Sequence, residues 1–65
     1  MFSDNLNRIL KEKGMSHYRL AQITEIGHDS MSLYRNGKRK PQIHNLKKIA
    51  DALNVKIDDL LERGK

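Results

Sequence analysis

The chain has 65 residues, no cysteine and a formal net charge of +5 at pH 7. This length predicts one small domain, over residues 1–65, with little room for a cleft that excludes water around a reaction. No apolar run approaches the roughly 18 residues that span a bilayer. Together with the absence of thiols, these features predict a cytoplasmic protein that is neither an enzyme nor a membrane protein.

The positive charge is concentrated in the middle of the sequence. Residues 30–50 contain six lysines and arginines and no acid, whereas bases and acids nearly cancel on either side of this block. A local basic block is typical of a surface that binds a polyanion, but basic segments are also common as plain solvated surface. Charge alone leaves both interpretations open.

Apolar residues recur at helical spacing from the start of the chain, without the alternation of a half-buried strand. The pattern predicts a helix over about residues 3–13, with Ser3 as its N-cap and Gly14 ending it in a left-handed conformation. Ser16 predicts the N-cap of a second helix, over about residues 17–24. The apolar stripes of these two helices are formed by Phe2, Leu6, Ile9, Leu10, Leu20 and Ala21.

Three more helices are predicted in the second half of the chain. A short helix, over about residues 28–36, offers only Met31 and Tyr34 to the core. The basic loop that follows is a stop signal, because its glycine supplies a positive φ and its proline cannot continue a helix. An apolar stripe at i, i+3, i+4 and i+7 predicts a helix over about residues 43–53. A last short helix is predicted over about residues 57–62. The predicted fold is therefore all-α, with five helices.

The predicted second and third helices are joined by a three-residue connector. This is the layout of a helix-turn-helix, whose second helix lies in the major groove of DNA. The sequence resembles the Cro and phage lambda repressor (XRE-type) family of helix-turn-helix proteins. The resemblance rests on Gly14, Ser16, Leu20-Ala21, Met31, the run Gly37-Lys38-Arg39-Lys40-Pro41, the segment IADALNV and Asp59-Leu60-Leu61. It implies a compact five-helix lambda-repressor-like domain that binds double-stranded DNA as a homodimer and acts as a repressor on a near-palindromic operator.

The resemblance also implies which residues of the third helix read the bases. They are His28, Asp29, Ser32 and Leu33. A histidine can donate to or accept from a base edge. Asp29 can accept a hydrogen bond from cytosine N4 or only stabilise the positive end of the helix dipole. Leu33 can contact a thymine methyl group or lie at the edge of the core, so both residues keep two interpretations.

A second group of residues is expected to bind the phosphate backbone. The implied contacts are His17, Gln22, Arg35, Asn36, Lys38, Arg39 and Lys40. His17 stands at the start of a helix, where anions are favoured. Lys47 and Lys48 point away from the apolar stripe of their own helix. They are not included among the phosphate contacts, because the simpler interpretation is that they belong to the solvated surface.

Four positions depart from the family. Leu10 and Arg35 stand where an arginine and a glutamate often pair in the interior, which leaves Arg35 able to extend toward the DNA backbone. Glu25 replaces a connector glycine, so that the turn is either shifted or strained. Lys56 replaces a common capping serine, which leaves the start of the last helix open.

Dimerisation is expected because one short helix reads too few base pairs for specificity. The apolar candidates for the dimer interface are Val55, Ile57, Leu60 and Leu61. The competing interpretation is a protein-interaction module of the same fold, such as an antitoxin or a bridging factor. No metal, cofactor or small-molecule ligand is expected, because the three histidines are 11 and 16 residues apart and there is no glycine-rich phosphate loop. A DNA-binding protein of this kind would be associated with the nucleoid.

Overall fold

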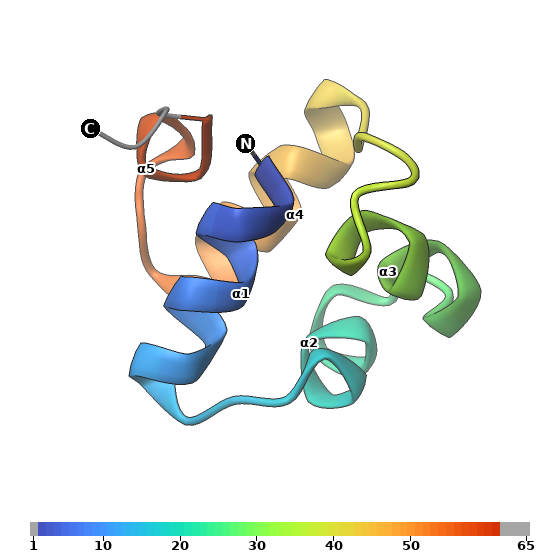
Figure 1. Ribbon diagram of the computed structural model, residues 1–65, viewed down its shortest axis with the longest axis horizontal. Coiled ribbons are helices and arrows are strands. Elements are labelled where there is room, and N and C mark those ends of the chain that lie inside the picture. Colours follow the sequence, from blue (N-terminus) through green and yellow to red (C-terminus); the bar gives the residue numbers. More distant parts are fainter. Residues whose placement is uncertain (1, 62–65) are drawn as a thin grey trace.

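Five helices and no strand make up residues 2–61, the part of the chain that the computed structural model describes (Figure 1). In chain order they are α1 (Phe2–Lys13), α2 (His17–Thr24), α3 (His28–Arg35), α4 (Ile43–Leu53) and α5 (Ile57–Leu61). The predicted all-α fold with five helices is confirmed over this range. Residue 62, the predicted end of the last helix, lies outside the described residues.

All five helices contribute to one apolar core. Its largest fully buried side chains are Leu6, Leu20, Met31, Ile49, Leu53 and Leu60. Every helix supplies at least one of them, and Ile49 and Leu53 of α4 lie four residues apart, as expected of a helix face that packs inward. Burying one side chain of this size contributes roughly 1.5–3 kcal/mol, so these contacts dominate the stability of so small a domain. Ile26 in the connector is buried as well, which the helical spacing did not indicate.

The first helix includes Phe2, one residue before its predicted start. Phe2 lies four residues before Leu6 and so continues the apolar stripe. Its ring packs edge-on against the ring of Tyr34, with the two centroids 6.5 Å apart. Ser3 therefore lies inside the first turn of α1, and its predicted role as the N-cap is wrong.

Glycines end α1 and α3 in left-handed conformations. Gly14 follows α1 with a φ of +65°, as predicted, and Gly37 follows α3 with a φ of +78°. After α3, the amide of Lys38 donates to the carbonyl oxygen of Leu33 at 2.9 Å, the long hydrogen bond of a Schellman motif. The last residue of α3 is Arg35, one residue before the predicted end. The basic loop thus leaves α3 through a defined turn.

The conformation of the connector between α2 and α3 shows whether the turn at Glu25 is shifted or strained. Ser16 caps α2 as predicted, since its Oγ accepts a hydrogen bond from the amide of Arg19 at 3.1 Å. At the other end of α2, Glu25 itself has a φ of +62°. The amide of the buried Ile26 then donates to Oγ1 of Thr24 at 3.4 Å. The turn is therefore strained at a residue with a side chain, and it is not shifted.

Replacing Glu25 by glycine is expected to stabilise the fold by about 0.5–1 kcal/mol, because the relief of left-handed strain outweighs the extra conformational entropy of glycine in the unfolded chain. Asn54 provides a matched control, since it follows α4 with a φ of +58°. Asparagine tolerates this conformation, so Asn54→Gly should change the stability by only about a few tenths of a kcal/mol. Urea unfolding measures both variants, and equal shifts would contradict strain at Glu25.

The last helix begins at Ile57 despite the lysine that precedes it. Oδ2 of Asp59 accepts a hydrogen bond from the amide of Lys56 at 3.2 Å, which is one half of a capping box. This contact supports the helix start where the family often has a serine. Nδ2 of Asn5 donates to the carbonyl oxygen of Leu60 at 2.8 Å in a buried position. This second hydrogen bond fastens α5 to α1.

The helices α3 and α5 lie on opposite sides of the molecule, as Figure 1 shows. α3 packs on α1 and α2, whereas α5 packs on α1 and α4. The molecule measures 30 × 23 × 19 Å along its principal axes. α1 therefore contacts the elements at both ends of the domain and sets their relative position.

Candidate nucleic-acid interface

Most of the surface of α3 is exposed, because only Met31 and Tyr34 of its eight residues are buried. All four residues predicted to read bases keep exposed surface. His28 and Asp29 lie in the first turn of α3, and Ser32 and Leu33 lie in the next turn. Leu33 is half-buried, so it borders the core and also reaches the surface. The structure thus brings the four predicted residues together on one outward-facing helix.

An aromatic residue that the sequence analysis did not select lies beside this helix. The ring of Tyr18, in the first turn of α2, stacks on the imidazole of His28, with the centroids 4.3 Å apart and the ring planes inclined by 20°. Tyr18 is nevertheless 59% exposed. The sequence carries no local signal for this contact, because the two residues meet only through the packing of α2 on α3.

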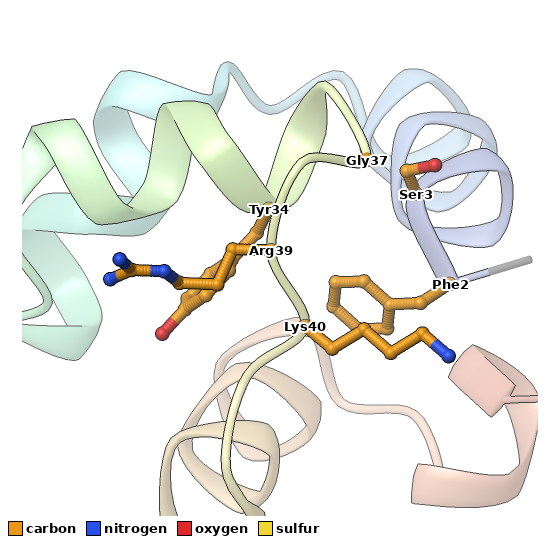
Figure 2. Close-up of a pocket in the computed structure, with 6 residues that line it drawn as sticks. All are labelled: Phe2, Ser3, Tyr34, Gly37, Arg39 and Lys40. Atoms are coloured by element: carbon orange, nitrogen blue, oxygen red, sulfur yellow. The ribbon is translucent and has the colours of Figure 1, made fainter.

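The basic loop after α3 lies against the N-terminal turn of α1 (Figure 2). Gly37 faces Ser3 there, and a Cβ on this glycine would lie 3.0 Å from the serine Oγ. A small hollow at this place is lined by Phe2, Ser3, Tyr34, Gly37, Arg39 and Lys40. The guanidinium of Arg39 and the ammonium of Lys40 point away from each other, to either side of the hollow (Figure 2). Like Lys38, both residues are exposed, so the loop presents three cationic groups to solvent.

Two asparagine side chains hold the C-terminal end of α3 from neighbouring helices. Nδ2 of Asn7 in α1 donates to the carbonyl oxygen of Arg35 at 3.1 Å. Nδ2 of Asn45 in α4 donates to the hydroxyl oxygen of Tyr34 at 3.2 Å. The end of α3 from which the basic loop departs is therefore fixed relative to α1 and α4.

Two predicted phosphate contacts from different helices border one shallow hollow. His17, at the start of α2, and Arg35, at the end of α3, both line it. The other lining residues are Asn7, Leu10, Met15 and Ser16. Leu10 is buried and Arg35 is exposed, so an apolar side chain fills the interior position while the arginine extends at the surface. The remaining predicted phosphate contacts, Gln22 and Asn36, are exposed as well.

The polar groups in the interior of the described chain are satisfied. Within residues 2–61, every buried side-chain nitrogen or oxygen has a hydrogen-bond partner. No three acidic, histidine or cysteine side chains of this range are grouped so that they could hold a metal ion. No helix of the same residues is both long and apolar enough to cross a membrane. The exposed face of α3 and its basic surroundings remain as the chemically distinctive surface.

One of the four residues predicted for a dimer interface belongs to the core. Leu60 has no exposed surface, so it cannot contact a partner and its assignment is corrected. Its neighbour Leu61 is 53% exposed. Val55 and Ile57 are partly buried against the core. We call the apolar surface formed by Leu61 with the exposed edges of Val55 and Ile57 the α5 surface.

Two short helices that pack on each other across a tight turn, the second of them outward-facing and followed by a basic loop, define the class of helix-turn-helix proteins. The family model of the Cro/C1-type HTH DNA-binding domain matches residues 5–65. The chain therefore belongs to this family of helix-turn-helix DNA-binding domains. The resemblance stated from the sequence is confirmed.

Individual relatives agree with this family. The chain is 32% identical over 62 residues to the HTH-type transcriptional regulator YqaE of Bacillus subtilis (strain 168). The aligned stretch covers 95% of this chain and 53% of that protein. It is also 32% identical over 62 residues to the SPbeta prophage-derived HTH-type transcriptional regulator YonR of the same organism, over 95% of this chain and 57% of that protein. The chain thus spans about half the length of these relatives.

A solved structure shares the fold. The crystal structure of a transcriptional regulator from Listeria innocua matches with a TM-score of 0.83 and 28% sequence identity. The match covers all of this chain and 61% of the other. The predicted lambda-repressor-like arrangement of the five helices is consistent with this neighbour.

Proposed function

We propose that the chain is a transcriptional repressor that binds a near-palindromic operator in double-stranded DNA as a homodimer, with α3 in the major groove. The observation that carries the proposal is the exposed face of α3 beside the exposed basic residues of the loop over 38–40. In this proposal residues 1–65 act as one DNA-binding domain in the cytoplasm, associated with the nucleoid. Binding requires neither a cofactor nor a small-molecule ligand.

The base contacts come from the outward side of α3. An α-helix with its side chains is about 10–12 Å in diameter, so α3 fits a major groove about 12 Å wide. In the first turn, His28 donates to or accepts from a base edge, and Asp29 accepts from cytosine N4. Ser32 and Leu33 lie one turn further on, where the leucine contacts a thymine methyl group. This set contains both polar and apolar readers of the groove.

The phosphate contacts come from residues that surround α3. The proposed set is His17, Gln22, Arg35, Asn36, Lys38, Arg39 and Lys40, all of which keep exposed surface. His17 and Arg35 share one hollow, and the three loop bases extend from the turn after α3. Each neutralised phosphate releases counterions and adds about one unit to the slope of log K against log salt.

The α5 surface supplies the contact between the two protomers of the proposed dimer. It lies away from α3, so that pairing leaves both α3 helices uncovered (Figure 1). Half-sites one turn of DNA apart place the two reading helices about 34 Å from each other. The domain is 30 Å long in its largest dimension, so two domains joined near α5 can span this separation. A second half-site doubles the number of base pairs that are read.

In this proposal the chain represses transcription by occupying its operator. A dimer that covers two adjacent half-sites excludes other proteins from the same stretch of DNA. Blocking a promoter in this way needs no contact beyond those with DNA and with the second protomer. The described surfaces, the α3 face and the α5 surface, supply contacts of these two kinds.

The experiment that tests the proposal is selection of bound duplexes from a random-sequence library across a series of salt concentrations. The stoichiometry of the complex is recorded at each step, and the selected site is then placed over a reporter promoter. We expect a near-palindromic consensus, a steep salt dependence, two chains per site and lower reporter output when the chain is present.

Weak binding without sequence preference would contradict operator recognition. It would favour the protein-interaction module of the antitoxin or bridging-factor type instead. A consensus with only one half-site and one chain per duplex would contradict the homodimer but not the reading by α3. Higher reporter output would contradict the repressor role alone.

A further inference from the structure

The stacked rings of Tyr18 and His28 join the two helices of the helix-turn-helix. Tyr18 is the second residue of α2, and His28 is the first residue of α3. Their centroids are 4.3 Å apart and their planes are inclined by 20°, which places the two rings in direct van der Waals contact. Both side chains are exposed, so the pair forms part of the surface next to the proposed base contacts.

Polar interactions do not fix the imidazole of His28 in the described part of the chain. Its side chain makes no hydrogen bond or ion pair within residues 2–61. The residue before it, Gly27, is the N-cap of α3 and has no side chain to contribute. An exposed histidine without a neighbour samples several rotamers, and ordering it on binding lowers the affinity. The tyrosine ring restricts the imidazole before DNA arrives.

The geometry of a stack suits this role. The donor and acceptor positions of an imidazole lie at its two nitrogens, in the plane of the ring. Stacking against Tyr18 occupies one face of the ring and leaves both nitrogens of His28 able to form hydrogen bonds. The contact therefore sets the direction of these bonds without consuming them. The tyrosine hydroxyl plays no part in this orientation.

We propose that Tyr18 is a positioning residue that sets base specificity through His28. This inference rests on the proposed function, in which α3 reads operator DNA. It assigns a role in recognition to a residue of α2, which lies outside the reading helix. The ring of Tyr18, and not its hydroxyl, carries the role.

The DNA test uses the consensus duplex that the wild-type chain selects from a random library, together with duplexes changed at one base pair at a time. The base pair read by His28 is the one at which His28→Ala loses discrimination. We expect Tyr18→Ala to lower the affinity for the consensus by about three- to tenfold and to flatten the preference at that base pair only. Tyr18→Phe should retain both. In the His28→Ala background, Tyr18→Ala should have no further effect on discrimination.

The stack is also tested in the free protein by NMR. Protons of His28 that lie over the tyrosine ring are shifted upfield by its ring current. Tyr18→Ala should move them downfield, whereas Tyr18→Phe should not. The protons of His44, which is exposed on α4, serve as the internal control and should stay unchanged in both variants. An unshifted His28 in the wild-type chain would overturn the proposal.

Other outcomes separate this inference from the function on which it rests. If Tyr18→Ala weakens binding to every duplex by the same factor, in the His28→Ala background as well, Tyr18 binds the backbone or supports the fold and the positioning role is wrong. Unchanged discrimination in Tyr18→Ala overturns the role and leaves operator binding intact. A wild-type chain that selects no sequence overturns the proposed function and this inference together.

Discussion

Replacing Lys38, Arg39 and Lys40 together by alanine is expected to lower the affinity for operator DNA by on the order of 10²- to 10³-fold at about 0.1 M salt. All three are exposed in the loop after α3, and a Schellman hydrogen bond holds the start of this loop. Each lost phosphate contact removes about 0.9 from the slope of log K against log salt, so the slope should fall by about three units. Titration of the selected duplex over a range of salt concentrations measures both quantities.

The matched control removes the same charge elsewhere on the surface. Lys11, Lys13 and Lys56 are exposed and lie outside α3 and its loop. Their replacement by alanine should change the salt slope by less than one unit, because only the long-range field is reduced. Equal effects of the two triple variants would show that net charge, and not contact by the loop, governs binding. Circular dichroism tests whether both variants fold.

Leu60→Ala is expected to destabilise the domain by about 2–5 kcal/mol, which is a large share of the stability of a chain this small. Leu60 has no exposed surface, and α5 is fastened at its carbonyl oxygen by Asn5. Truncation leaves a cavity between α5 and the rest of the core. Urea unfolding at low protein concentration measures the loss. A change below about 1 kcal/mol would contradict the burial of this side chain.

The neighbouring leucine provides the contrasting variant. Leu61 is 53% exposed, so Leu61→Ala should change the stability of the single domain by no more than about 0.5 kcal/mol. It should weaken the proposed dimer, because it removes the most exposed side chain of the α5 surface. Sedimentation at several protein concentrations measures this. Unaltered self-association would remove the α5 surface from the dimer proposal.

The helices could be predicted from the sequence because the signals that bound them are local. Ser16 accepts from an amide three residues away, and Gly14 and Gly37 take the left-handed conformation that glycine adopts freely. Such contacts depend on a few neighbouring residues, which a sequence displays directly. The base-reading candidates were also placed on an exposed helix as expected, since α3 has few apolar residues.

The features that could not be predicted depend on contacts between helices. Leu60 and Leu61 are both apolar, and only the packing of α5 on α1 decides which of them is buried. Glu25 has no local preference that would separate a strained turn from a shifted one. Burial of Ile26 beside it favours the strained turn. Tyr18 was missed for the same reason, because its partner lies in the next helix.

The residues that hold α3 in the fold differ from the residues that are proposed to read the bases. Two inward side chains, Met31 and Tyr34, pack it into the core. A further support at the end of α3 is the hydrogen bond from Asn7 to the carbonyl oxygen of Arg35. Main-chain acceptors are present whatever side chain the residue carries. The outward positions of α3 are therefore free to diverge with little effect on stability. If α3 reads operator DNA as proposed, descendants of this chain can acquire new operators one substitution at a time while they inherit the same scaffold.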